Sequence, residues 1–521
     1  MPQKNRCSIL FIIFIVLFVN CAGFGRCFSS PLPGDEKQPG TTAGGNIDVE
    51  KTYKDARFSF LAEHLNKKDY SKLLLREKLL LIECLSRTAQ GPLAKEKMKT
   101  ILREQPAAAD ILTTAGILYT ALGQLVKANL YIKRALTIDE NFPAALLARA
   151  MLHLYFQRYR EAETCCEKLV EKNPGWKETY LFLFAGLEIY KGSRNPVKLK
   201  EMYDLLAKKN KKNDKISYQN FKATSRFLKK ALKGTLFDVE TAADRVTVPF
   251  AGQTGSDDKK TILLNFKDRC FRVLLDTGNA VGWFIYSSEL RDRVKVVRGG
   301  KAFTRIGIED TSLEGHHIYC KRIDFGNFTM SHVAGQFLVK PHPDFYDANL
   351  NPLFIRNRVV TLDFIRQEMV LTTKERFEKE LAGRRQGVTY ARLPWYGYEC
   401  AYVPVNVGGT PGLAMIETGA EDIALKLDFA RELGLPLKPQ NRYFANGKVF
   451  QYHKTPVSLS IDKFTFRREN AEVWPLNRIY NPITGLTAHV VIGPTVLQGK
   501  FAVSFDPFEK KVILEYGPGQ R

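Results

Sequence analysis

The sequence predicts a multidomain protein, in which an all-α solenoid of helical repeats precedes a mostly-β region of two similar lobes. Three observations lead to this prediction. Residues from about 55 to 235 show helical periodicity, with alanines that return every 34 residues. From about residue 241 the pattern changes to short alternating apolar runs divided by Gly, Asn and Asp, which is typical of strands and turns. Within this second region two motifs recur in the same order, which indicates an internal duplication.

Length and composition set the outer limits. The 521 residues are enough for about three or four domains. With 45% hydrophobic and 26% charged residues, the chain has the balance of an ordinary globular protein, which excludes a disordered chain and a polytopic membrane protein. Lys and Arg number 78 against 55 Asp and Glu, so the net charge of +23 favours acidic partners or anionic surfaces.

The segment from Met1 to Ser30 has the features of a targeting segment. Lys4 and Arg6 precede an apolar run from Ile9 to Val19, as in a signal peptide or an N-terminal anchor. This run is shorter than the roughly 20 residues that a transmembrane helix needs. We therefore expect an exported protein, periplasmic or extracellular, with a lipidated Cys21 as the alternative form of attachment.

The helical repeats follow a predicted linker at residues 31–54 and are assigned to residues 55–235. Ala94, Ala128 and Ala162 are 34 residues apart, and small residues at such positions let paired helices approach closely. The pattern resembles tetratricopeptide repeats, which implies a concave surface for a protein partner. The alternative is a structural spacer without a ligand.

Residues 191–233 are the most basic part of the chain, with 14 Lys and Arg against three Asp and Glu. One interpretation is contact with an anionic surface, such as lipid or a cell-wall polymer; the other is a solvated helix face. No recognised DNA-binding motif or aromatic-rich single-strand platform accompanies the charge, so no nucleic acid partner is expected.

The duplication in the second half involves two motifs. The run LLDTGNA returns as MIETGA, and farther along each copy VTLD returns as VSFD. They occupy Leu274–Ala280 and Met415–Ala420, and Val360–Asp363 and Val503–Asp506. Nearly equal offsets for two separate motifs predict two lobes, assigned to residues 241–385 and 386–521.

These residues resemble the two lobes of a pepsin-like or retropepsin-like aspartic peptidase, over roughly residues 245–515. In that family each lobe carries an apolar-Asp-Thr-Gly turn, and a later apolar-apolar-Gly stretch packs beneath it. Val490–Gly493 fits this stretch in the second lobe, while Asn351 or its neighbours stand at the corresponding place in the first. The resemblance implies that Asp276 and Glu417 are a catalytic pair sharing one proton, which activates water against a protein or peptide substrate.

The resemblance also assigns supporting roles. The hydroxyls of Thr277 and Thr418 would hold the two turns together, and Gly278 and Gly419 would permit their tight backbone. Substrate-covering flaps are expected downstream of each turn, around residues 297–307 and 442–452. This chemistry requires no metal and no cofactor, and none is predicted.

Glu417 stands where the family carries its second aspartate. The extra methylene moves the carboxyl by about 1.5 Å, whereas catalytic groups tolerate about 0.5 Å, and Asn279 replaces the usual small residue after the first turn. The main hypothesis is an exported aspartic endopeptidase with repeats that bind substrate or a partner. The alternatives are an inactive pseudopeptidase that binds extended peptides and a scaffold protein that acts through its repeats.

Cysteine and histidine residues are scattered through the chain. Separate thiols are the commoner explanation for such cysteines; if the exported protein does form a disulfide, Cys270 with Cys320 is the expected pair. His316 and His317 near Cys320 lack a fourth ligand in sequence, so they are interpreted as ordinary surface residues and not as a metal site.

Overall fold

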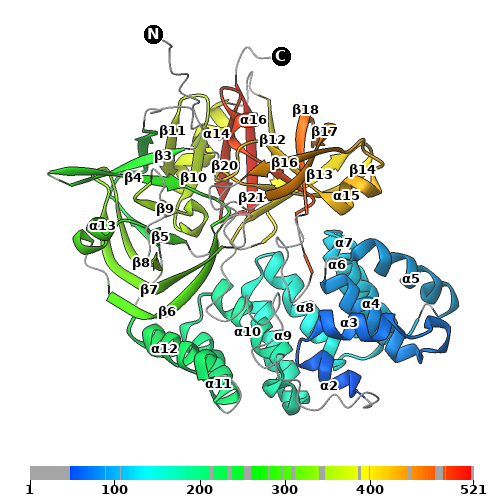
Figure 1. Cartoon of the computed structure of the whole chain (residues 1–521). Helices are drawn as coiled ribbons and strands as arrows, with labels where there is room; N and C mark the ends of the chain where they lie inside the picture. Colours follow the sequence, from blue (N-terminus) through cyan, green and yellow to red (C-terminus); the bar gives the residue numbers. More distant parts are fainter. Residues whose placement is uncertain are drawn as a thin grey trace, which may run out of the picture.

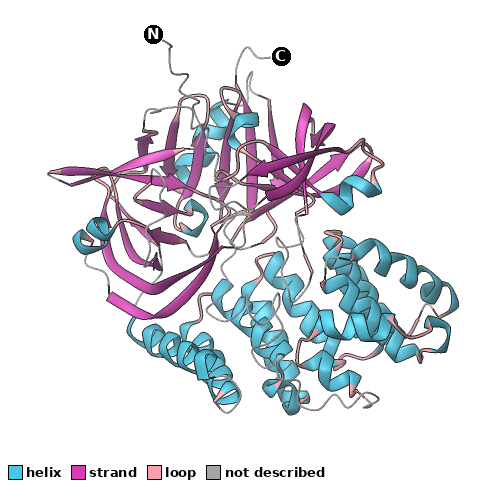
Figure 2. Cartoon of the chain, viewed as in Figure 1, coloured by secondary structure: helices cyan, strands magenta, loops and turns pink. Residues whose placement is uncertain are grey.

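The computed structural model describes residues 47–517, apart from residues 89, 106, 212–214, 232–236, 252–259, 267, 280–281, 295–296, 307–310, 339–345, 385–388, 398, 444–448, 476–484 and 487. The predicted export segment at residues 1–30, with Cys21, lies outside these residues, as does most of the predicted linker. Within the described part of the chain, no helix combines the length and apolar character needed to cross a bilayer. An all-helical body and a mostly-β body pack side by side (Figure 2).

The helical body is built of antiparallel helix pairs (Figure 1). The pairs are α4 with α5, α6 with α7, α8 with α9 and α10 with α11, and α12 packs on α11. The bounds are α2 (Val49–Lys54), α3 (Phe58–Asn66), α4 (Leu75–Arg87), α5 (Gly91–Glu104), α6 (Ala109–Ala121), α7 (Leu125–Ile138), α8 (Pro143–Tyr155), α9 (Tyr159–Lys172), α10 (Tyr180–Gly192), α11 (Pro196–Asn210) and α12 (Lys215–Ala231), with short 3-10 turns η1 (Tyr70–Lys72) and η2 (Pro174–Glu178). This arrangement followed by β-lobes confirms the predicted fold class.

The small residues that define the repeat lie where helices touch. Ala94, Ala128 and Ala162 are fully buried on α5, α7 and α9. A Cβ on Gly116 of α6 would come within 2.4 Å of the Ile132 side chain on α7, so a larger residue here would force that side chain aside. The pair α10 and α11 continues the stack after η2, which accounts for the shift in sequence register near residue 180.

Helix α2 lies on the inner side of the curved stack. It contacts both α4 and α10, although α6 and α8 stand between these two in the row. A six-residue helix is only about 9 Å long, so the row must curve around it. The predicted linker 31–54 is therefore wrong at its end: Asp48 caps α2 by accepting from the Lys51 N–H at 2.9 Å, and Tyr53 is buried.

The two lobes have the same strand order. The lobe 1 sheet runs β3 (Thr261–Phe266), β4 (Arg269–Leu275), β9 (Ala348–Leu350), β5 (Trp283–Ile285), β8 (Thr329–Leu338), β7 (Thr311–Asp324), β6 (Val297–Ile306), with β1 (Asp238–Glu240) beside β8. The lobe 2 sheet runs β13 (Ala401–Val407), β14 (Thr410–Ile416), β19 (Val490–Ile492), β15 (Ile423–Lys426), β18 (Phe464–Trp474), β17 (Val449–Ile461), β16 (Lys438–Tyr443). Apart from β1, each strand of one sheet has its counterpart in the other, and β4–β9 and β14–β19 are both parallel pairs.

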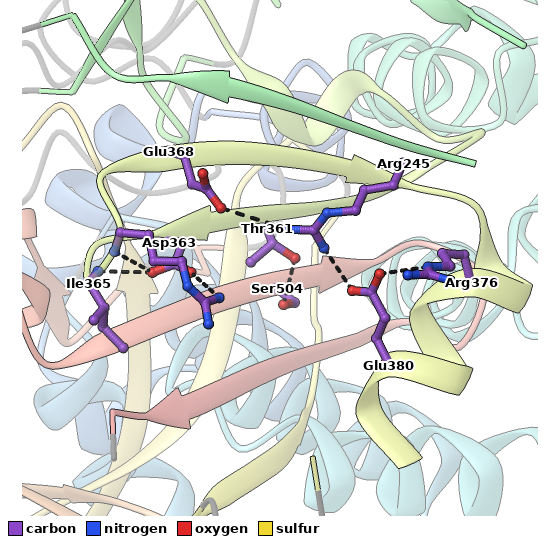
Figure 3. A network of polar contacts seen from close by, with 9 residues as sticks. Arg245, Thr361, Asp363, Ile365, Glu368, Arg376, Glu380 and Ser504 are labelled. Carbon is purple, nitrogen blue, oxygen red and sulfur yellow. Dashed lines mark hydrogen bonds and ion pairs between the residues drawn. The ribbon is translucent and has the colours of Figure 1, made fainter. Parts of the chain in front are cut away.

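A third sheet joins the lobes. Its order is β12 (Tyr390–Pro394), β21 (Lys511–Tyr516), β20 (Phe501–Asp506), β10 (Val359–Asp363), β11 (Glu368–Thr372), β2 (Arg245–Pro249). The recurring tail motifs therefore lie side by side at its centre, where the hydroxyls of Thr361 and Ser504 are 2.8 Å apart (Figure 3). Helices α13 (Ser288–Arg293), α14 (Lys374–Arg384), α15 (Leu427–Glu432) and α16 (Pro494–Leu497) and the turn η3 (Pro352–Phe354) complete the lobes.

Charged side chains fix α14 to the edge of this joining sheet. Glu380 on α14 accepts from Arg245 of β2 and from Arg376 of its own helix, both at 2.7 Å (Figure 3). The Asp363 carboxylate closes the turn after β10 by accepting from the backbone N–H groups of Ile365 and Arg366. The joining sheet is therefore held by both lobes and covered by a helix of lobe 1.

Cys270 and Cys320 form no disulfide, in agreement with the interpretation of the cysteines as separate thiols. Both residues are free thiols, like the other cysteines in the described residues. Cys270 lies on β4 and Cys320 on β7, and three strands separate β4 from β7 in the sheet. With about 4.8 Å between neighbouring strands, the two residues are well beyond the roughly 7 Å that a disulfide can span.

Candidate active site

The two DTG-like turns meet at the interface between the lobes and hold each other by their threonines. The Thr277 hydroxyl donates to the Ile416 carbonyl at 2.8 Å, and the Thr418 hydroxyl donates to the Leu275 carbonyl at 2.7 Å. Each hydroxyl also accepts the backbone N–H of the other threonine, at 3.0 Å and 2.9 Å. Every bond crosses from one lobe to the other, so the two turns are fixed as one unit.

These threonine hydrogen bonds bring Asp276 and Glu417 together. The Gly278 N–H lies 3.1 Å from Asp276 Oδ1 and also 3.1 Å from Glu417 Oε1, so one backbone donor serves both carboxyls. Glu417 Oε1 accepts a second bond from the Gly419 N–H at 2.9 Å. The residues that the sequence predicts as catalytic and supporting thus form one cluster.

The longer Glu417 side chain fits because Gly278 has none. A Cβ on Gly278 would lie 1.3 Å from Glu417 Oε2, whereas a Cβ on Gly419 would lie 2.8 Å from Asp276 Oδ1. The two distances differ by about one C–C bond, roughly 1.5 Å, which is the extra methylene of glutamate. The carboxyl of Glu417 therefore reaches further across the symmetry axis than that of Asp276.

The electrostatics of the pair favour a proton on Glu417. Burial raises the pKa of Glu417 well above its usual 4.5, and the charge of Asp276 and a side-chain hydrogen bond to Asp276 raise this pKa further. The N–H groups of Gly419 and Gly278 act in the opposite direction. A second negative charge this close to the first costs much electrostatic free energy. The pair therefore holds one proton over a wide pH range.

Sequence reasoning missed the residue that contacts Asp276 from below. Asn349 on β9 donates from Nδ2 to Asp276 Oδ2 at 2.6 Å, and Asn279 donates to Asn349 Oδ1 at 2.7 Å. Both asparagines are fully buried. The available signal was an Asn in a buried three-residue strand, Ala348–Leu350, at a place where lobe 2 has the wholly apolar Val490–Ile492.

Asn351 takes the place of the glycine that follows the corresponding strand in lobe 2. Its Nδ2 donates to the Asn279 carbonyl at 2.7 Å and to the Glu399 carbonyl at 2.9 Å. The side chain thus connects the first turn to the segment before β13. The departure from the family pattern at this position is therefore an additional link between the lobes.

The helical body contacts the segment before β13, which lies next to the carboxyl pair. The Tyr155 carbonyl at the end of α8 accepts from the Gly397 N–H at 2.9 Å, and Lys191 of α10 forms an ion pair with Glu399. Next in the chain, Cys400 is buried and its thiol lies 3.9 Å from the Gly278 carbonyl. Asp276 and Glu417 have no exposed surface in this conformation.

A hairpin follows each turn in the region where a flap is expected. β6 and β7 form one in lobe 1, and β16 and β17 form the other in lobe 2. Helix α12 of the helical body packs against β6 and β7. The predicted flap segments 297–307 and 442–452 fall partly outside the described residues, at 307 and 444–448.

Nothing in the described residues forms a metal site, since no group of three or more His, Cys, Asp and Glu side chains lies close enough to hold an ion. His316 and His317 of β7 are both partly exposed, and desolvation lowers the pKa of His317 to about 4. Several lysines of the basic stretch 191–233 are engaged within the chain: Lys200 pairs with Asp204 at 2.5 Å, and Lys209 donates to the Glu178 carbonyl at 2.9 Å. Contact with an anionic surface stays a prediction.

Comparison with known proteins agrees with the geometry of lobe 2. The family model described as aspartyl protease matches residues 403–495, which include Glu417. This match confirms the resemblance of the second lobe to aspartyl proteases. No curated protein matches the sequence.

Solved structures similar to parts of this chain represent both bodies. A retropepsin-like aspartic protease from Rickettsia conorii is 21% identical over 25% of this chain and 94% of its own, with a TM-score of 0.20. A tetratricopeptide repeat protein from Parabacteroides merdae is 22% identical over 35% of this chain and 72% of its own, with a TM-score of 0.24. Basic 7S globulin from soybean is 12% identical over 53% of this chain and 97% of its own, with a TM-score of 0.28.

Proposed function

We propose that this protein is an aspartic-type endopeptidase that cleaves protein or peptide substrates with Asp276 and Glu417 as its carboxyl pair. The observation that carries the proposal is the single Gly278 N–H, 3.1 Å from an oxygen of each carboxyl. The shared donor at equal distances supports the proposal, because it brings one oxygen of each carboxyl to the same point, as activation of one water molecule needs.

In the proposed reaction Asp276 begins as the carboxylate and Glu417 as the acid. The water oxygen bonds to the substrate carbonyl carbon as Asp276 takes a water proton, while the carbonyl oxygen receives the proton of Glu417. When the resulting diol collapses, the C–N bond breaks, Asp276 passes its proton to the leaving nitrogen, and Glu417 recovers a proton from a diol hydroxyl. The pair returns to its starting state without a metal or a covalent intermediate.

The second candidate is a pseudopeptidase that binds an extended peptide between its lobes without cutting it. The observation that favours it is the complete burial of both carboxyls, which leaves no path for water or substrate in this conformation. A peptide bound in this way would add backbone hydrogen bonds to a strand edge. The two candidates differ in whether the segment over the carboxyl pair opens.

The other parts of the proposal concern location and partners. We propose that the protein acts after export, as the segment from Met1 to Ser30 suggests, and that the inner face of the helical stack recruits substrate or a protein partner. The hollow beside α2 supports such a role, because its walls are apolar and include Ile117, Leu147 and Leu181. The basic stretch 191–233 is the proposed contact with anionic surfaces.

The test is cleavage of an unfolded protein substrate by the full chain from pH 3 to pH 7. Asp276→Asn and Glu417→Gln each remove one ionisable group with little change of volume. We expect cleavage by the parent protein on the acidic side and a loss of at least about a hundredfold in both variants, because neither retains a pair that can exchange a proton.

Glu417→Asp is the third variant. It gives a symmetric aspartate pair, and we expect it to cleave, since the equivalent turn around Gly419 already accommodates an aspartate. No cleavage by any folded form, combined with saturable binding of an extended peptide, would replace the enzyme by the pseudopeptidase. Cleavage that persists in Asp276→Asn would assign the activity to another site.

A further inference from the structure

The outer oxygens of the two carboxyls have different surroundings. The inner oxygens, Asp276 Oδ1 and Glu417 Oε1, share the Gly278 N–H, and Glu417 Oε1 also accepts from the Gly419 N–H at 2.9 Å. The outer oxygen of Asp276, Oδ2, accepts from Asn349 at 2.6 Å. The outer oxygen of Glu417, Oε2, is buried and has no hydrogen-bond partner among the described residues. The pair is therefore chemically asymmetric beyond the difference between aspartate and glutamate.

The direction of the Asn349 amide is determined by its neighbours. Asn279 Nδ2 donates to Asn349 Oδ1 at 2.7 Å, so the NH2 group of Asn349 must point the other way, toward Asp276. Asn279 is itself held by Asn351, which donates to its backbone carbonyl at 2.7 Å. The three asparagines are fully buried, so water does not compete for these bonds.

Lobe 2 has no equivalent chain of donors. In the parallel pair β4–β9, Leu274 lies opposite Asn349, and in β14–β19 the corresponding Met415 lies opposite Val491. Likewise Ala420 follows the second turn where Asn279 follows the first. Valine and alanine side chains donate no hydrogen bonds, so nothing at these positions stabilises a negative charge on Glu417.

From this asymmetry we propose that Asn349, oriented by Asn279, is a positioning residue that keeps Asp276 ionised and thereby places the shared proton on Glu417. The inference rests on the proposed function, since it assigns Asp276 as the base and Glu417 as the acid. An amide N–H is a donor only, so its bond to Asp276 Oδ2 favours the carboxylate over the protonated form. The charge of Asp276 then holds the proton on Glu417, which has no competing donor at Oε2.

The test uses Asn349→Leu, which keeps the branched shape and removes the donor. We expect kcat/KM at the parent's optimum to fall about 10- to 100-fold, as for loss of a hydrogen bond to a charged group. The acidic limb of the pH profile should move upward by about one to two pH units. Asn279→Ala removes only the hydrogen bond that orients the Asn349 amide. It should shift the acidic limb in the same direction by a smaller amount.

A control and a second measurement separate this role from simple packing. Val491→Ala removes side-chain volume at the matching position below Glu417, and it should leave the acidic limb in place whatever it does to stability. The titration of Asp276 is followed directly by NMR of protein with 13C-labelled aspartate carboxyls, with the signal identified by its loss in Asp276→Asn. Its midpoint should rise in Asn349→Leu.

The outcomes distinguish this inference from the proposed function. If the parent protein does not cleave but the Asp276 midpoint rises in Asn349→Leu, the proton assignment stands and the endopeptidase proposal fails. If the parent cleaves and Asn349→Leu lowers the rate without moving either the midpoint or the acidic limb, Asn349 is only a packing residue and the inference is overturned. A folded Asn279→Ala with an unchanged midpoint would also overturn it, should Asn349→Leu not fold.

Discussion

The carboxyl of Glu417 occupies the position of the side chain that Gly278 lacks. A Cβ on Gly278 would overlap Glu417 Oε2 at 1.3 Å, although the two residues belong to different lobes. Both positions are sealed from solvent by the turns that the two threonines hold together. The glutamate is thus accommodated by the glycine of the opposite turn.

Gly278→Ala should therefore destabilise the protein more than Gly419→Ala. The new methyl group would force the buried Glu417 carboxyl aside, at a cost of about 1–3 kcal/mol or more for overpacking, whereas the contact at Gly419 is looser at 2.8 Å. Urea denaturation measures the difference. The control is Gly383→Ala on α14, where a Cβ meets nothing within 4 Å and where alanine should add roughly 0.5–1 kcal/mol. Equal losses in both turn variants would contradict the prediction.

The raised pKa of Glu417 predicts a pH dependence of stability. Between pH 4.5 and the higher pKa of the folded state, the folded protein binds more protons here than the unfolded protein does, so stability falls as pH rises. Glu417→Gln cannot lose a proton at this position. Relative to the parent, it should gain stability above pH 4.5, by up to about 1.4 kcal/mol per pH unit.

Thermal unfolding of both proteins from pH 4 to pH 7 checks this dependence. The control is Glu104→Gln, an exposed carboxyl at the end of α5, whose stability difference from the parent should stay nearly constant. A constant difference for Glu417→Gln as well would show that Glu417 is not held protonated by folding.

The Lys191–Glu399 ion pair should govern access to the carboxyl pair. It ties α10 to the segment that places Cys400 beside Gly278. Lys191→Ala should raise the rate at which Cys400 is alkylated by several-fold, because the buried thiol reacts only after this segment opens. Mass spectrometry of the Cys400 peptide gives the rate.

A second ion pair between the two bodies provides the matched control. Lys95 pairs with Glu432 at 3.1 Å, on α5 and α15, in the other part of the interface. Lys95→Ala should leave the alkylation of Cys400 unchanged. Equal acceleration by both variants would mean that the helical body as a whole covers the site.

Tyr53 of α2 should stabilise the helical stack through a buried network. Its hydroxyl donates to Glu83 and accepts from Arg87 at 3.0 Å, and Thr114 donates to the other oxygen of Glu83 at 2.7 Å. Tyr53→Phe removes a donor from a carboxylate that is 1% exposed, which should cost about 1–3 kcal/mol in urea denaturation.

The comparison variant is Tyr218→Phe on α12. The Tyr218 hydroxyl accepts from Lys222 at 2.9 Å in an exposed setting, so this change should stay within about 0.5 kcal/mol. A loss for Tyr53→Phe as small as that for Tyr218→Phe would show that the inner face holds α2 without the help of this network.

The parts of the fold that follow from local pattern could be predicted from sequence. The 34-residue spacing of Ala94, Ala128 and Ala162 reports contacts within neighbouring helix pairs, and the recurrence of the two motifs reports a duplicated lobe. The duplication also placed Asp276 and Glu417 in equivalent turns. Both signals exist because equivalent positions in each unit make the same packing contacts.

Other features of the fold and the site depend on long-range contacts that leave no periodic pattern in the sequence. Asn349 meets Asp276 only because β9 pairs in parallel with β4 across 73 residues of chain, and its role becomes apparent when the matching valine in lobe 2 is known. Helix α2 is too short for a period to emerge, and its position depends on the curvature of the stack. Cys270 and Cys320 share a lobe, but their separation depends on a strand order that sequence does not give.

The joining sheet has a consequence for how the chain folds. β10 completes its ladder only when β20 pairs with it, and the facing residues Thr361 and Ser504 are 143 positions apart. Until that partner emerges during synthesis, β10 is an open strand edge on lobe 1, able to pair with an edge of another molecule. Closing so long a loop is also slow, because its entropy is lost before the contact forms. The connection that unites the lobes in the finished protein therefore makes its assembly a late and aggregation-exposed step.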